Sequence, residues 1–184
     1  MKLRVYLAGP MDGQDEETIH GWREEIKSRV HNTVECVDPS SLPFSKDFPS
    51  GDEAWDIVQA DLALIDSSHM VCAMCDLSTA GTAQEVLYSF MNQLPVLIIN
   101  TNGKLSPFTR TFSDQVVGSI DEAVTIINDM GSVADYVDYL NTLVQEKCGI
   151  LPFNKSFLYE TVAISRDAHG ISKQFKNKET EDVE

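Results

Sequence analysis

The sequence has no apolar run long enough to cross a membrane, and it has few basic side chains. Its 184 residues include 14 lysines and arginines against 29 aspartates and glutamates, which gives a formal net charge of −15. A surface of this charge repels phosphate backbones and anionic lipids. We therefore expect neither duplex nucleic acid nor a membrane as a partner. A single small anionic ligand is not excluded, because local donors decide its binding.

Cysteine and histidine are also scarce, with four of each. Cys72-x-x-Cys75 has the spacing of half a zinc or redox site, but no second pair and no nearby histidine pair completes it. Because both cysteines lie in an apolar run, we interpret them as buried reduced thiols and expect a cytoplasmic protein. The glycine pattern of dinucleotide-binding proteins and the lysine of a P-loop are absent as well. We expect neither a metal nor a cofactor.

Apolar strand-like runs alternate with segments of helical periodicity, which is typical of a parallel α/β sheet. The predicted strands are 2–8, 34–37, 69–75, 95–99 and 116–117, and long loops are expected over 39–52 and 100–113. The length suits one domain with additional residues. We interpret 1–131 as the α/β domain and 132–184 as a C-terminal helical extension, with helical spacing over 133–144 and a charged, disorder-type tail over 173–184.

The most informative segment is the run from Asp76 to Glu85. It follows an apolar strand and precedes an amphipathic helix of about 80–92, so it predicts a strand, a glycine-bearing turn and a helix start. Glu85 is then expected in the first turn of that helix, above the carboxyl ends of the strands, where open α/β sheets bind ligands. Two interpretations remain open. Glu85 either stabilises the helix start by its charge or is a reactive carboxylate.

Other polar side chains are predicted at the same edge of the sheet. Tyr6 comes from the first strand, Gly9 opens the turn after it, and Asp61 lies on the helix before the third strand. Each has an ordinary interpretation, with Tyr6 as a core residue and Asp61 as a solvated helix residue. Together, however, a tyrosine and several carboxylates around a glycine turn, without a poised histidine, favour glycosyl-transfer chemistry.

Several segments, taken in order, resemble the nucleoside 2-deoxyribosyltransferase family. They are Tyr6-Leu7-Ala8-Gly9-Pro10-Met11, Gly21-Trp22-Arg23, Ala60-Asp61-Leu62, Ser78-Thr79-Ala80-Gly81-Thr82-Ala83-Gln84-Glu85 and Leu94-Pro95-Val96-Leu97. The resemblance covers residue 1 to about residue 130. It implies a flavodoxin-like three-layer α/β sandwich with a five-stranded parallel sheet.

The resemblance also implies roles for individual residues. Glu85 is the nucleophile that attacks C1′ of a 2′-deoxyribosyl group, Tyr6 holds it, and Asp61 contacts and protonates the base. The residues implied in substrate binding are Gly9, Pro10, Met11, Asp76, Ser78, Thr79, Gly81, Thr82 and Asn100. The implied ligand is a small nucleoside or nucleotide. A homo-oligomer, dimeric or larger, is expected, in which Asn100 or a C-terminal residue completes a neighbouring site.

Two positions depart from the family pattern. The acid that transferases often carry just before the glycine turn falls on Thr79, with Asp76 three residues earlier, and the aspartate that often starts the third strand falls on His69.

Transfer of deoxyribose between bases is slightly favoured. The first alternative is a hydrolase of deoxynucleoside 5′-monophosphates, whose phosphate would be bound by Ser78, Thr79, Arg23 and backbone N–H groups. The second is a non-catalytic nucleotide-binding module.

Overall fold

The computed structural model describes residues 2–43, 51–77 and 79–132. Within them, Lys2–Gly131 forms one compact unit. The helix predicted over 133–144 and the charged tail over 173–184 lie outside the described residues. The division of the chain into 1–131 and 132–184 therefore stays a prediction.

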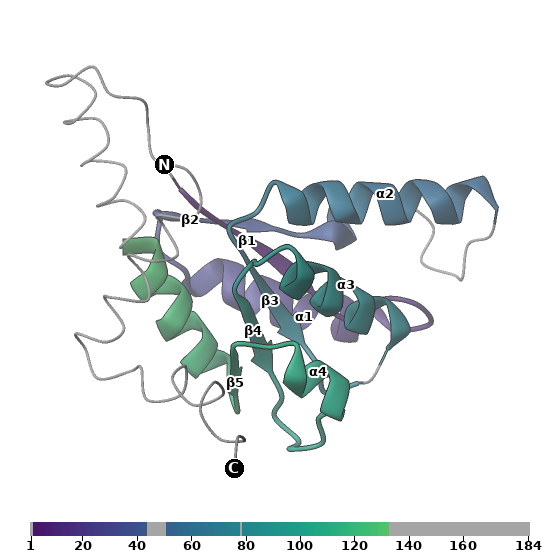
Figure 1. Ribbon diagram of the computed structural model, residues 1–184. Helices are drawn as coiled ribbons and strands as arrows, with labels where there is room; N and C mark the ends of the chain where they lie inside the picture. The colour runs from purple at the N-terminus through teal and green to yellow at the C-terminus, as the bar shows by residue number, and fades with distance from the viewer. Residues whose placement is uncertain (1, 44–50, 78, 133–184) are drawn as a thin grey trace, which may run out of the picture. The chain divides into compact units, whose positions relative to one another are not determined.

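The described residues contain one sheet of five parallel strands in the order β2-β1-β3-β4-β5 (Figure 1). The strands are β1 (Leu3–Ala8), β2 (Val34–Val37), β3 (Met70–Met74), β4 (Val96–Ile99) and β5 (Gln115–Val117). This is the strand order of flavodoxin-like folds. It confirms the predicted fold class and the predicted five-stranded sheet.

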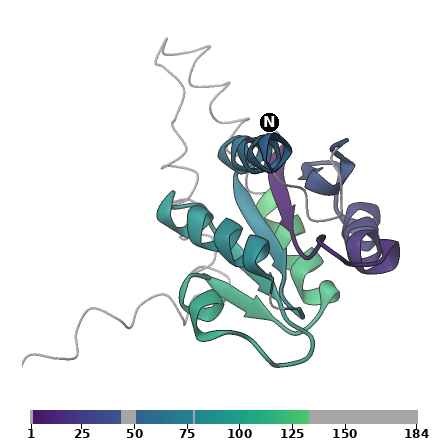
Figure 2. The same cartoon turned by 90° about the vertical axis from the view of Figure 1, so that its right-hand side faces the viewer.

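Helices cover both faces of the sheet, as parallel strands require. α1 (Glu16–Arg29) and the helix that starts at residue 120 lie on one face, and α2 (Asp52–Asp66) and α3 (Ala80–Met91) lie on the other (Figure 2). An ion pair between Arg29 and Asp121 links the two helices of the first face. The result is the three-layer sandwich that the resemblance implies.

Two short helices occupy segments that were predicted as loops. A 3-10 helix, η1 (Pro39–Ser41), follows β2, and α4 (Pro107–Thr111) lies between β4 and β5. The fixed φ of Pro107 suits the first position of a helix, but five residues are too few for helical periodicity to be recognised. Phe112, at the end of α4, packs on Phe90 of α3 with 5.3 Å between the ring centroids.

The central strands form the core. Val5 and Leu7 of β1, Cys72 of β3 and Ile98 of β4 have no exposed surface. Cys72 and Cys75 are buried free thiols, as predicted. Among the described residues, no helix combines the length and the apolar character that crossing a bilayer requires.

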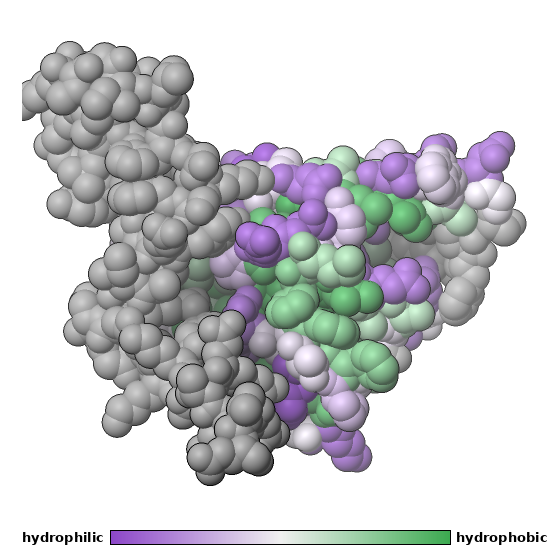
Figure 3. Space-filling model, viewed as in Figure 1, coloured by the Kyte–Doolittle hydropathy of each residue, from purple (hydrophilic) through white to green (hydrophobic). Residues whose placement is uncertain are grey.

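One face of the molecule keeps apolar side chains in contact with solvent (Figure 3). They lie on α2, α3 and α4, and the larger ones are Trp55, Val58, Leu87, Phe90, Met91 and Phe108. On α2, Ile65 is fully buried, whereas Trp55 of the same apolar stripe is 66% exposed. We call this group the α2–α4 apolar face.

The strand order predicts a ligand site beside β1. The chain leaves β1 for β2 on one side of it, and β3 lies on the other side. In open α/β sheets, ligands bind outside the carboxyl ends of the strands at such a switch point. A site is therefore expected at the carboxyl ends of β1 and β3.

Candidate active site

Tyr6, Asp61 and Glu85 come together at this switch point, each from a different element. Tyr6 lies on β1, Asp61 on α2 and Glu85 on α3. The Tyr6 hydroxyl donates a hydrogen bond of 2.5 Å to Oε1 of Glu85. Asp61 lies close enough to interact electrostatically with both. The structure thus brings together the three residues for which the sequence predicts catalytic roles.

Glu85 lies deeper in its helix than the sequence predicts. α3 begins at Ala80 with Thr79 as its N-cap, so Glu85 belongs to the second turn, and the first turn of α3 contains no acidic residue. The predicted place in the first turn is wrong, because in a helix that starts at Ala80 Glu85 is the sixth residue. Since the stabilising effect of the helix dipole falls off within the first turn, the dipole does not account for a carboxylate here.

The environment of Glu85 favours its protonated form. Burial raises the pKa of Glu85 to about 8, and the negative charges of Asp61 and Asp12 contribute to the rise. The hydrogen bond from Tyr6 and the positive charge of Arg23 oppose it, because both stabilise the carboxylate. A carboxyl group that ionises near neutral pH and is poorly solvated as an anion suits the role of a nucleophile.

Asp61 forms a titrating pair with Glu85. Burial raises the pKa of Asp61 to about 6, although its interactions with Tyr6 and Arg23 lower it. Carboxyl groups that interact this closely titrate together. Between about pH 6 and about pH 8 the pair therefore holds one proton. A nucleophile and a proton donor can be drawn from such a pair.

The turn after β1 adds backbone and a third carboxyl group to the site. Gly9 is a steric requirement, because a Cβ at this position would lie 2.7 Å from the Trp22 ring. Pro10 is buried beside it, and Met11 is partly exposed. Asp12 is exposed and acts electrostatically on both Glu85 and Asp61. Asp12 was not among the predicted site residues, although its place in the turn after β1 was a usable signal.

Arg23 of α1 lies buried behind this turn, and its side chain has no exposed surface. Its guanidinium donates to the carbonyl oxygens of Leu7, Gly9 and Ile19 and forms an ion pair of 3.4 Å with Asp38. Every guanidinium nitrogen is thus engaged within the chain. The suggestion that Arg23 binds a substrate phosphate is therefore wrong. Arginines are mostly exposed, although the spacing of Arg23 from Ile19 and Ile26 places it on the buried face of α1.

Asp76 and Asn100 join the end of β3 to the loop after β4. Asp76 accepts hydrogen bonds of 2.6 Å from the backbone N–H of Thr101 and 2.5 Å from its hydroxyl. Asn100 is 6% exposed, and its amide donates to the Cys75 carbonyl at 2.9 Å. Both side chains therefore brace this loop within their own chain. Their predicted contacts with substrate stay predictions.

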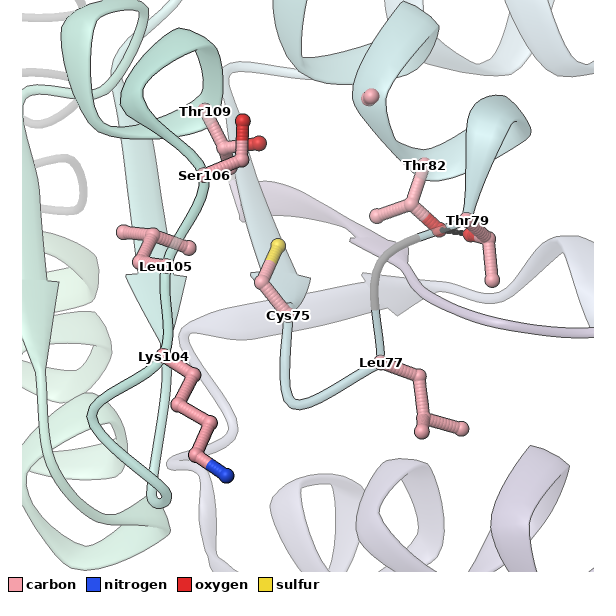
Figure 4. A pocket seen from close by; sticks show the side chains of 9 residues that line it. Cys75, Leu77, Thr79, Thr82, Lys104, Leu105, Ser106 and Thr109 are labelled. Atoms are coloured by element: carbon pink, nitrogen blue, oxygen red, sulfur yellow. Dashed lines mark hydrogen bonds between the residues drawn. The ribbon is translucent and has the colours of Figure 1, made fainter.

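Two of the predicted binding residues, Thr79 and Thr82, line a pocket on the side of α3 that is turned toward α4 (Figure 4). The other lining residues are Cys75, Leu77, Ala83, Lys104, Leu105, Ser106 and Thr109. The Thr79 hydroxyl donates to that of Thr82 at 2.8 Å. Ser78 lies outside the described residues.

Gly81, in contrast, shares the face of α3 that carries Glu85, because residues four apart lie one above the other on a helix. A Cβ built at Gly81 would meet no atom within 4 Å. Neither a close contact nor a positive φ calls for glycine at this position. The predicted role of Gly81 in substrate binding stays a prediction.

His69 lies at the opposite edge of the sheet, at the amino end of β3. The ring nitrogen Nδ1 of His69 accepts a hydrogen bond of 2.9 Å from the backbone N–H of Arg4. The backbone N–H of His69 donates to the Arg4 carbonyl at 2.8 Å. His69 therefore extends the pairing of β1 with β3. The departure from the family pattern at this position concerns strand pairing rather than the recognition of a base.

The chemistry available at the site is that of two neighbouring carboxyl groups that share one proton near neutral pH, one of them held by Tyr6. Burial, followed by the charges of Glu85 and Asp61, raises the pKa of Tyr6 far above its usual value, so its hydroxyl stays a donor. In the described part of the chain, no group of three or more His, Cys, Asp or Glu residues is arranged to hold a metal ion. The cluster fits nucleophilic displacement with proton transfer to a leaving group.

No protein-family model and no curated protein matches this sequence. Solved structures do match it. One is the crystal structure of a conserved protein from Enterococcus faecalis V583, with a TM-score of 0.61, 19% identity, and coverage of 70% of this chain and 99% of that chain. Another is a 2-deoxyribosyltransferase from the psychrotolerant bacterium Bacillus psychrosaccharolyticus, with a TM-score of 0.51, 19% identity, and coverage of 66% and 90%. At this identity the likeness shows the fold alone, and the chain has the fold of a 2-deoxyribosyltransferase.

Proposed function

We propose that this protein cleaves the N-glycosidic bond of 2′-deoxynucleosides and transfers the deoxyribosyl group to a second base. The observation that carries the proposal is the hydrogen bond between Tyr6 and Glu85, with Asp61 beside it at the carboxyl end of β1. The fold shared with a 2-deoxyribosyltransferase supports the same chemistry.

Glu85 acts as the nucleophile in the first step. Its carboxylate attacks C1′ of the deoxyribosyl group, the bond from C1′ to the base nitrogen breaks, and the leaving base takes a proton from Asp61. Tyr6 holds the attacking carboxylate in place through its hydrogen bond. The product of this step is the free base and a deoxyribosyl ester of Glu85.

The second step reverses the first with a different base. The incoming base attacks C1′, its proton returns to Asp61, and the ester bond to Glu85 breaks. Two displacements at C1′ give retention of configuration. Between about pH 6 and about pH 8 the pair holds one proton, which must first move from Glu85, the group of higher pKa, to Asp61. It then leaves with the base in the first step and returns in the second.

The charge of the site favours a neutral nucleoside. Asp12, Asp61 and Glu85 place three carboxyl groups around the reacting position, and the cation that interacts with them, Arg23, is engaged with backbone carbonyls and Asp38. A phosphate group brought to this position would meet like charge at short range, which costs binding free energy.

Hydrolysis of a deoxynucleoside 5′-monophosphate is the second candidate, and one feature favours it. The pocket beside the start of α3 offers an amino group from Lys104 and hydroxyl groups from Ser106, Thr79 and Thr109 (Figure 4). Such donors suit a phosphate group. In that case water rather than a second base would resolve the ester of Glu85.

We also propose that the protein works as a homo-oligomer. The support is the α2–α4 apolar face, on which Trp55 is 66% exposed, Met91 72% and Phe108 74%. Exposed apolar groups of this size mark interaction surfaces. The substitution Trp55→Ser should lower the molar mass measured by light scattering. A parent protein with the mass of a single chain would contradict the proposal.

The function is tested by incubating the protein with each deoxynucleoside and each 5′-monophosphate, with and without a free base. Chromatography should show base exchange from deoxynucleosides that requires the added base. Release of free deoxyribose phosphate would favour the hydrolase, and binding without turnover would favour a non-catalytic module. Glu85→Ala should abolish exchange, whereas the control Gln84→Ala, an exposed neighbour on α3, should retain it.

A further inference from the structure

We propose that Arg23 is a positioning residue of this site, which holds the end of β1 so that Tyr6 meets Glu85 and whose charge favours the ionised form of Glu85. The inference rests on the proposed function for its kinetic part. Arg23 forms no hydrogen bond to Tyr6, Asp61 or Glu85, so it would act through the backbone and through its charge.

The backbone part follows from the hydrogen bonds of the guanidinium. Nε donates to the carbonyl of Leu7 at 3.3 Å, and Nη2 donates to the carbonyl of Gly9 at 3.1 Å. Leu7 is the residue directly after Tyr6, and Gly9 opens the turn that carries Asp12. Arg23 thus ties α1 to the backbone on the carboxyl side of Tyr6, just where β1 ends.

Trp22 fixes the orientation of this tie. The carbon at the centre of the guanidinium lies 4.6 Å from the centre of the indole ring, which is the distance of a cation–π contact. The same indole fills the space that a Cβ at Gly9 would need. The planar guanidinium is therefore held between the indole and the turn, an arrangement that a lysine does not reproduce.

The charge part follows from the surroundings of Asp38, the ion-pair partner of Arg23. Asp38 already accepts a hydrogen bond of 2.5 Å from the amino group of Lys27 and one of 2.6 Å from the hydroxyl of Ser40. Its charge is thus compensated without Arg23. The positive charge of Arg23 also acts on Glu85 and favours its ionised form.

Groups from every neighbouring element face Glu85. Tyr6 on β1 donates to it, Asp12 in the turn and Asp61 on α2 are acidic, and the Cys75 thiol after β3 interacts with it. Arg23 on α1 is the cation among the groups that act on Glu85. Its removal should therefore shift the ionisation of Glu85 to higher pH.

The test is a carbon-13 NMR titration of the Glu85 carboxyl group in the parent, Arg23→Leu, Arg23→Lys and Arg29→Leu, with kcat and KM for base exchange measured in parallel. Arg23→Leu should raise the midpoint of Glu85 by about one pH unit or more and lower kcat about 10- to 100-fold, with a smaller change in KM. Arg23→Lys should restore the midpoint but not kcat. Arg29→Leu, which removes another cation of α1 that pairs with Glu25 and Asp121, should change neither.

The outcomes separate this inference from the proposed function. If the parent exchanges no base but the midpoint still shifts in Arg23→Leu, the function is wrong and the electrostatic role of Arg23 stands. If the parent is active and Arg23→Lys is as active, or if the midpoint is the same in parent and Arg23→Leu, the inference is overturned. Arg23→Gln replaces Arg23→Leu if the latter does not fold.

Discussion

The hydroxyl of Tyr6 donates to Oε1 of Glu85 at 2.5 Å, although the two residues are 79 positions apart in the sequence. Burial, followed by the charges of Glu85 and Asp61, raises the pKa of the Tyr6 hydroxyl well above its usual range. The phenol therefore keeps its proton wherever the protein is folded and serves Glu85 as a fixed donor. The bond orients the carboxylate and also favours its ionisation.

Tyr6→Phe should lower kcat/KM for base exchange about 100-fold, since a positioned donor in a buried site contributes this much. Loss of the donor also leaves the Glu85 carboxylate less stabilised. The rise of kcat/KM with pH should therefore move to higher pH than in the parent. Tyr88→Phe removes a similar but solvent-exposed bond of 2.9 Å from the Tyr88 hydroxyl to Asp66 and should leave the pH–rate profile unchanged. Parent-like kinetics of Tyr6→Phe would contradict the prediction.

Glu85→Gln should stabilise the fold, and more strongly at high pH. The pKa of Glu85 is raised from 4.5 to about 8 by burial first and by Asp61 and Asp12 next, so the folded state holds this proton where the unfolded chain has lost it. Its favourable contribution is complete below about pH 4.5 and is lost as the pH rises through about 8. We expect a gain of about 1–3 kcal/mol at pH 8.5 and a smaller gain at pH 5. Urea unfolding at both pH values measures it, and equal gains would refute this origin.

The sheet and the places of Tyr6, Asp61 and Glu85 in the chain were predictable because local patterns determine them. β1, β3 and β4 are apolar runs that end at recognisable turns, and parallel strands place their carboxyl ends at one edge. Tyr6, Asp61 and Glu85 each lie at a defined place relative to such a run. Their convergence follows from topology alone, before any side-chain contact is known.

The partners of polar side chains could not be predicted in the same way. Arg23 shares the buried face of α1 with Ile19 and Ile26, but its carbonyl partners depend on the turn at Gly9, which lies against it. Asp76 bonds Thr101, 25 residues later, because two loops meet. Contacts of this kind depend on where separate segments approach each other, and no local pattern records that. The short helix α4 was missed for the simpler reason that it has one turn.

Asp61→Asn should slow base release by about 10²- to 10⁴-fold, which is typical for the loss of a general acid. In the parent, kcat/KM should rise and fall around neutral pH, with limbs near the pKa values of about 6 for Asp61 and about 8 for Glu85, both raised chiefly by burial. The variant should lose one limb. The other should move to lower pH, because one negative charge beside Glu85 is gone. An unchanged rate would place Asp61 among the solvated helix residues.

Gly81→Leu should preserve the fold and weaken substrate binding. The position is exposed, helical and free of neighbours within 4 Å of a Cβ, so a side chain fits the folded protein and improves helix propensity. The same side chain would fill the space one turn before Glu85. We expect KM to rise about tenfold, which corresponds to about 1.4 kcal/mol of binding free energy. Gln84→Leu, the control at an exposed site of the same helix, should leave KM unchanged.

Asp76→Ala should lower the free energy of unfolding by about 1–3 kcal/mol, because it leaves the N–H and hydroxyl of Thr101 without their charged acceptor. Thr101→Val removes one of the same two bonds from the other side and keeps the Asp76 carboxylate. A smaller loss of stability is expected for it. The KM values then decide whether Asp76 has a second role. An increase in Asp76→Ala that Thr101→Val does not share assigns a substrate contact to the carboxylate, since bracing alone would affect both variants in proportion to their stability.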